Sequence, residues 1–174
     1  MRPRDHSLSR FHLRDPHIGA GPVDTEARLF RLLGALQLVL LPLAMLAYGE
    51  RYSLLSNALS DLGTLRTPAG ETNGLSALLF ATDLTATSVV LCSYAVRIRR
   101  KSGIGHPALK ADFAWIGAAG ALLALAPHDA HRLVHGIGAG MLVGSLWMLA
   151  NLLALELRDR EPPAARRIEL VLQA

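Results

Sequence analysis

The amino-acid sequence predicts an all-α fold, an integral membrane bundle of four transmembrane helices with the N and C termini in the cytoplasm. Half of the 174 residues are apolar and the mean hydropathy is positive, which is unusual for a soluble domain of this length. The apolar residues gather in four segments, each close to the ~20 residues that cross a bilayer. These segments are 29–48, 75–96, 111–126 and 131–155.

The cations are sorted between the connections of these segments. Of the 18 Lys and Arg residues, six lie in 1–31, five in 97–110 and four in 156–174. The remaining three are Arg51, Arg66 and Arg132. Because cytoplasmic connections carry the excess of Lys and Arg, this alternation predicts four spans in the cell (inner) membrane. The same distribution of charge indicates that the protein's partner is the lipid bilayer. We expect no binding of nucleic acid.

The two ends of the chain differ in composition from the middle. Residues 1–28 are basic, rich in proline and without apolar periodicity, so we expect a disordered cytoplasmic tail. No small-residue cleavage pattern follows 29–48, so this segment is expected to stay as an anchor. Residues 29–155 form the predicted four-helix domain, and 156–174 are either a cytoplasmic tail or the start of a truncated fifth helix.

Gln37, Asn151 and Asp83 are polar side chains inside the predicted spans. Gln37 and Asn151 should lie at a similar depth, so we expect an amide hydrogen bond between their helices. Asp83 lies about 12 Å below the outer boundary of the second span at the helical rise. A carboxylate at that depth faces the bundle interior or a wet cavity. Asp83 is therefore either part of a functional cavity or a satisfied packing group.

Small residues fill the third and fourth segments. The segment 111–126 is rich in Gly and Ala, and Gly136, Gly140 and Gly144 follow at intervals of four. Small residues at this spacing let helix backbones approach closely, which predicts a tight hairpin of the two spans. The alternative is a homo-oligomer or helix partner bound through the same three glycines.

Two polar stretches, 53–73 and 127–135, fall on the extracytoplasmic side, where we expect them to meet. The histidines of the second stretch are spaced i, i+3 and i+7, which places them on one face of a helix. The candidate ligand-binding residues are Ser60, Asp61, Asp83, Asp129, His128, His131 and His135.

The polar cluster permits three interpretations: a structural network, a site for a lipid headgroup or ion, and a metal hydrolase centre. His131 and His135 have the i, i+4 spacing of two imidazoles that share a metal, and Asp61 supplies an oxygen ligand in this alternative. Serine catalysis by Ser60 is disfavoured because no nucleophile elbow accompanies it, and adjacent Ser and Asp typically start a turn. We therefore expect no catalytic residue and no cofactor. Zinc is expected only if the cluster is a metal hydrolase centre.

The motif Ser60-Asp61-Leu62-Gly63 after the first span, with Pro68 following, carries a family resemblance. With the proline-containing turn and His before a glycine-rich span, it resembles the bacterial and archaeal multi-pass family catalogued as domain of unknown function 998. More distantly the chain is similar to the eukaryotic DRAM/FRAG membrane proteins. The resemblance covers 29–155 and implies an integral membrane protein without established chemistry, although such families usually have five or six spans.

A second resemblance concerns the His131 to His135 pair, which is similar to the pair used by ceramidase-like membrane hydrolases together with Ser and Asp around zinc. The order and number of spans differ from that group. The leading hypothesis is therefore a non-enzymatic polytopic membrane protein with an extracytoplasmic polar pocket for a lipid headgroup, an ion or a partner. The alternative is a zinc-dependent membrane lipid hydrolase or amidase.

Overall fold

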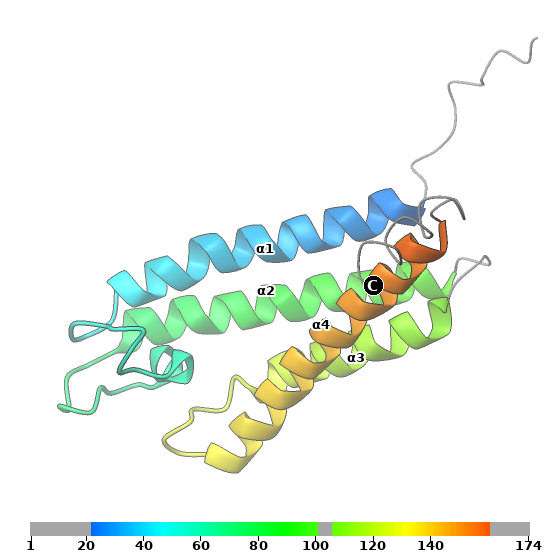
Figure 1. Ribbon diagram of the computed structural model, residues 1–174. Coiled ribbons are helices and arrows are strands. Elements are labelled where there is room, and N and C mark those ends of the chain that lie inside the picture. Colours follow the sequence, from blue (N-terminus) through cyan, green and yellow to red (C-terminus); the bar gives the residue numbers. More distant parts are fainter. Residues whose placement is uncertain (1–21, 101–105, 161–174) are drawn as a thin grey trace, which may run out of the picture.

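The computed structural model describes residues 22–100 and 106–160, and in these ranges the chain is helical with a single isolated β-bridge. Figure 1 shows four α-helices, and a short 3-10 helix lies between the first two. The elements are α1 (Pro22–Leu46), η1 (Leu59–Gly63), α2 (Gly74–Arg99), α3 (Pro107–Leu123) and α4 (Arg132–Arg160). The predicted all-α class is confirmed.

Within the described residues, three helices are long and apolar enough to cross a membrane. They are α1 from Ala27 onward, the whole of α2, and α4 as far as Arg158. The remaining helix, α3, has 17 residues. Several apolar spans indicate a membrane protein, whereas a crossing by α3 stays a prediction.

The helices extend beyond the apolar segments at the ends of the domain. α1 begins at Pro22, which suits the first helical turn because proline lacks the N–H that would be unpaired there. Residues 22–28 of the expected tail are thus helical, and 1–21 lie outside the described residues. α4 likewise continues to Arg160, so residues 156–160 of the segment expected as a tail or as the start of a fifth helix belong to α4. Residues 161–174 are not described.

Each helix packs on the next one in the chain, α1 on α2, α2 on α3 and α3 on α4. The connections 47–73 and 124–131 lie at one end of the bundle, which we call the loop end (Figure 1). The start of α1, the end of α2, the start of α3 and the end of α4 lie at the other, which we call the basic end.

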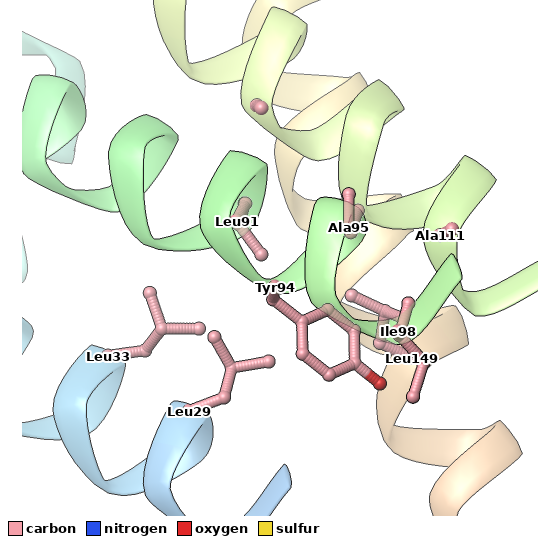
Figure 2. Packing of buried hydrophobic residues seen from close by; sticks show 10 residues of the cluster. Leu29, Leu33, Leu91, Tyr94, Ala95, Ile98, Ala111 and Leu149 are labelled. Atoms are coloured by element: carbon pink, nitrogen blue, oxygen red, sulfur yellow. The ribbon is translucent and has the colours of Figure 1, made fainter. Parts of the chain in front are cut away.

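Two apolar clusters form the core. The cluster nearer the basic end surrounds Tyr94 of α2, which lies between the leucines of α1 and the side chains of Ile98 and Leu149 (Figure 2). The cluster nearer the loop end joins the end of α1 to η1, α2 and the residue after α3. Its buried members are Ala44, Tyr48, Leu62, Phe80, Leu84 and Ala124.

α2 buries several polar side chains among apolar ones, and it also exposes large apolar side chains. Its buried polar residues are Ser76, Asp83, Thr87 and Ser88. Its large exposed apolar residues are Leu75, Leu78, Val89 and Val96. Two of the buried hydroxyls donate to backbone: Ser76 Oγ to the carbonyl of Leu62 at 3.2 Å, and Ser88 Oγ to the carbonyl of Ala118 at 3.0 Å. The exposed aliphatic side chains distinguish α2 from an amphipathic helix of a soluble protein.

The predicted tight hairpin of the third and fourth spans is confirmed, but with different glycines. A Cβ on Gly120 would lie 2.6 Å from the Leu142 nitrogen and 2.7 Å from the Gly138 carbonyl oxygen, so α3 and α4 touch through backbone. The glycines at 136, 140 and 144 have no atom within 4 Å of such a Cβ. The expectation that these three pack the hairpin is wrong, because the rotation of α4 turns them outward. Their use in an oligomer stays a prediction.

An ion pair joins α3 and α4 near the basic end. Lys110 Nζ lies 2.6 Å from Glu156 Oε2, and the lysine side chain is only 3% exposed. Lys110 was expected in an open connection. It lies instead in the first turn of α3, because that helix begins at Pro107.

Candidate functional site

Asn73 holds the connection 47–73 in place. Its side chain is fully buried, and its Nδ2 donates to the carbonyl oxygens of Thr64 at 2.9 Å and of Asp61 and Leu62 at 3.3 Å. Its Oδ1 accepts the N–H of Gly49 at 3.2 Å. One amide thus joins the chain after α1, the end of η1 and the start of α2. Its place just before an apolar helix is typical of a helix cap, but here the amide faces back to the loop.

Asp61 shapes the turn that contains it. Its Oδ2 accepts the N–H of Ala58 at 2.9 Å, and its backbone oxygen accepts the N–H and the hydroxyl of Thr64 at 3.1 and 2.7 Å. Ser60 lies beside it in η1, half-buried. The interpretation that Ser60 and Asp61 form a turn is therefore confirmed.

The remainder of the connection is also closed by hydrogen bonds. Ala69 N–H donates to Glu50 Oε1 at 3.0 Å, and Arg66 Nη1 donates to the carbonyl of Gly70 at 3.0 Å. Gly70 has a φ of 91°, a region that favours glycine, so the tight turn depends on this residue. These contacts make the connection a defined cap on the bundle.

The three histidines do not share one helical face, so that prediction is wrong. α4 begins at Arg132, and His128 and His131 precede it in a turn whose N–H groups bond to the Pro127 carbonyl. The His135 side chain is buried, with Nδ1 3.0 Å from the carbonyl oxygen of Ala126. Because a carbonyl only accepts, Nδ1 carries the proton.

Two of the three histidine rings are nevertheless in contact. His128 and His135 contact edge to face, with centroids 5.5 Å apart and planes at 81°. His131 and Asp129 are exposed, and Asp129 Oδ1 accepts the N–H of Ala130 at 3.1 Å, so it closes the turn and does not cap α4. Around this turn, His128 and His135 therefore pack against each other, whereas Asp129 and His131 are exposed to solvent.

The two polar stretches meet at a small cavity of about 20 Å³. Gly63 and His135 line it from opposite stretches, together with Phe80 and Ala126. A Cβ on Gly63 would lie 2.8 Å from Phe80 Cδ1, so this approach requires glycine. A cavity of this size holds about one water molecule. Asp61 is not among its lining residues.

Asp83 belongs to a different part of the molecule, between α1 and α2. Gln37 Nε2 lies 3.1 and 2.9 Å from its two carboxylate oxygens and 3.4 Å from Thr87 Oγ1. Asn151 instead donates to the carbonyl of Trp147 in its own helix, so the predicted bond between Gln37 and Asn151 is wrong. The reason is the packing order, since α1 contacts α2. The carboxylate thus joins the two helices through Gln37, and a role of Asp83 in ligand binding stays a prediction.

Comparison of the chain with family models, with curated proteins and with solved structures found no match. The resemblance to the multi-pass family catalogued as domain of unknown function 998 therefore stays an expectation. Geometry and charge alone carry the functional inference.

Two tyrosines at the loop end were not expected as part of the cluster. Tyr48 and Tyr52 contact edge to face with centroids 5.3 Å apart. Tyr52 Oη donates to the Ala58 carbonyl at 3.1 Å. Burial, and then the charge of Asp61, raise the pKa of the Tyr52 hydroxyl above its usual value. The two tyrosines lie only four residues apart at the end of the first apolar segment, and this short spacing is the signal that could have indicated their contact.

Among the described side chains, those of 27–100 and 106–158, no three of His, Cys, Asp or Glu lie close enough together to hold a metal ion. The alternative zinc set of His131, His135 and Asp61 stays a prediction. Metal analysis of the purified protein tests it, because a zinc enzyme would carry stoichiometric zinc and lose it in a His131→Ala variant.

Proposed function

We propose that the chain is a four-span membrane protein of the cell (inner) membrane, with the loop end outside and both termini in the cytoplasm. The observation that carries the proposal is the exposure of large aliphatic side chains on α2, a helix that also buries hydroxyls and a carboxylate. In water the exposure of these aliphatic side chains would be unfavourable. In a bilayer the same exposure is favourable, and polar groups belong inside the bundle.

The other helices support the same reading. Large apolar side chains with most of their surface exposed also occur on α1 and α4. The most exposed of these are Leu38, Leu46 and Leu133. These side chains have no protein neighbour to cover them within the described chain, so lipid is the environment that suits them.

The charge distribution supports the orientation. The basic end carries a group of exposed Arg residues, Arg28, Arg31, Arg97, Arg99 and Arg100. The loop end carries only Arg51, Arg66 and Arg132 within its described residues. The excess of cations on the cytoplasmic side is the general rule for membrane proteins, so the basic end is assigned to the cytoplasm.

For the loop end we infer a binding role without catalysis, for a lipid headgroup, an ion or a partner. Asp61 and His135 are occupied in shaping the backbone, whereas Asp129 and His131 are exposed beside the cap. Because the enclosed cavity is only about 20 Å³, the ligand would contact the exposed surface and not a deep pocket.

Reporter fusions after residues 70, 105 and 128 test the four-span topology. We expect the fusions after 70 and 128 to report the outside and the fusion after 105 the cytoplasm. If α3 does not cross, the fusions after 105 and 128 report the same side, which overturns the fourth span. If 70 and 105 agree, α2 does not cross and the whole proposal fails.

A photoreactive residue at position 131 tests the binding role in intact cells, with position 55 as control. Leu55 is fully exposed in the same loop end but lies outside the histidine turn. A defined lipid or protein adduct at 131, and none at 55, supports the proposal. Equal labelling at both positions, or none at 131, contradicts it.

A further inference from the structure

A groove of about 370 Å³ runs between α1 and α2 at the basic end. Its walls combine Arg28 and Leu32 of α1 with Val89, Ser93 and Arg97 of α2. We propose that this groove binds one anionic phospholipid of the cytoplasmic leaflet, with the phosphate between the two guanidinium groups. The proposal rests on the membrane topology inferred above.

The charges at the rim of the groove are complementary to a phosphate. Arg28 and Arg97 come from different helices and line the same space, and none of the groove's lining residues is acidic. Among the side chains of 27–100 and 106–158, neither guanidinium has an ion-pair partner, unlike Arg99, which lies 3.0 Å from Asp112. Two like charges across one groove repel, and a bidentate phosphate between them removes that repulsion.

The groove becomes apolar with depth, as a lipid requires. Leu32 lies one turn from Arg28 toward the middle of the bundle, about 6 Å deeper at the helical rise, and Val89 lies about 12 Å deeper than Arg97. Both side chains are at least half exposed. The floor is Leu29 and Tyr94, which belong to the core cluster (Figure 2).

Ser93 occupies the level between the arginines and the aliphatic wall. Its side chain is exposed and lines the groove, so it offers a hydroxyl donor near the position of a glycerol ester. The sequence of cations, hydroxyl and aliphatic surface matches the order of groups along a phospholipid. Basic pockets between transmembrane helices on the cytoplasmic side are typical sites for such headgroups.

The test uses the full chain purified in detergent and reconstituted in nanodiscs of phosphatidylglycerol and phosphatidylcholine, with bound lipid counted by native mass spectrometry. We expect one retained phosphatidylglycerol in preference to phosphatidylcholine. The Arg28→Gln/Arg97→Gln variant should reduce this preference roughly 30-fold, since each cation near the surface contributes about a factor of five. Free glycerol phosphate should give no bound species, which separates a lipid from a soluble phosphate.

The matched control is Arg31→Gln/Arg100→Gln, which removes two exposed charges at the same end from residues outside the groove. An equal loss in this control would show a general surface effect and overturn the site. Val89→Trp keeps both arginines and fills the groove, so an unchanged lipid preference in this variant also overturns it.

Failure of this inference is distinguishable from failure of the topology. Alkaline extraction and the reporter fusions are applied to the same proteins. If the wild-type chain is inserted with the basic end in the cytoplasm but shows no lipid preference, only the groove is wrong. If the chain is not retained in the membrane, or its basic end lies outside, the topology is wrong, and this inference with it.

Discussion

The amide of Gln37 bridges both carboxylate oxygens of Asp83, at 3.1 and 2.9 Å, and joins α1 to α2 inside the bundle. Asp83 is 1% exposed, so water cannot replace that donor readily. A buried polar group that loses its partner costs more than the hydrogen bond itself contributes.

We therefore expect Gln37→Leu to lower the free energy of unfolding by about 1–2 kcal/mol. Asp83→Asn keeps an acceptor for Gln37 and should cost less, and the double variant Gln37→Leu/Asp83→Leu should recover most of the loss. Unfolding titrations in mixed micelles measure these values. A double variant as unstable as the sum of its parts would contradict the pairing.

Asn73→Ala should open the connection 47–73. Its amide makes three donor contacts and one acceptor contact to backbone, so its removal leaves several buried groups unpaired, at about 2–3 kcal/mol. Hydrogen exchange of the loop amides and limited proteolysis measure the opening. The control is Asn57→Ala, because Asn57 accepts from the neighbouring Ser53 N–H. Equal effects of the two variants would refute the central position of Asn73.

Lys110→Met should destabilise the contact of α3 with α4 by about 2–4 kcal/mol, because it leaves Glu156 without its buried cation. Replacing both partners, Lys110→Met/Glu156→Leu, should restore most of the stability. Arg99→Gln is the control: Arg99 and Asp112 form a pair whose side chains are 61% and 54% exposed, and exposed pairs contribute ~0–1 kcal/mol. Thermal melting in detergent compares the variants, and similar losses for both pairs would contradict the prediction.

Gly138→Ala and Gly140→Ala separate the two faces of α4. A methyl group at 138 would meet the backbone of Gly120 in α3 and of Ala124 just after it, so we expect a loss of about 1–3 kcal/mol. The open side of 140 accommodates a methyl group, and alanine favours a helix by ~0.5–1 kcal/mol over glycine. Melting temperatures should therefore move in opposite directions. If Gly140→Ala disrupts an oligomer in gel filtration, the predicted glycine partner surface is supported.

Tyr52 makes the loop end sensitive to alkaline pH. Because burial and Asp61 raise its pKa in the folded protein, the folded state holds the phenolic proton more tightly than the unfolded chain. The resulting stability is present below the usual tyrosine pKa of about 10 and is lost as pH rises through the higher folded value. Tyr52→Phe should show a smaller fall in melting temperature between about pH 8 and about pH 11. An identical fall would exclude Tyr52 as the cause.

Segment length and hydropathy were sufficient to predict the helices, because a run of apolar residues has few other ways to satisfy its backbone. Helix rotation was not predictable. The spacing of Gly136, Gly140 and Gly144 indicates that they share one face of α4. It does not indicate which face packs on α3, and that face is set by the close contact of Gly120 with Gly138. The wrong prediction for the partner of Gln37 has the same cause, because that partner depends on which helices are neighbours.

The geometry of the loops was harder to predict from the sequence than the helices were. The histidine spacing indicated one helical face only if the helix had started before His128, and it starts at Arg132. Asn73 carried no motif, since its partners are backbone groups up to 24 residues away in the chain. Contacts of this kind follow from the closed path of the loop and not from any local pattern.

In the proposed four-span topology, the short length of α3 would have a consequence for the surrounding bilayer. Its 17 residues extend about 26 Å at the helical rise, less than the ~30 Å hydrocarbon core that its partner α4 is long enough to cross. Such hydrophobic mismatch is relieved by local thinning of the lipid or by tilt of the longer neighbour. Bilayer thickness would then select where the protein resides, with thinner membranes favoured over thicker ones.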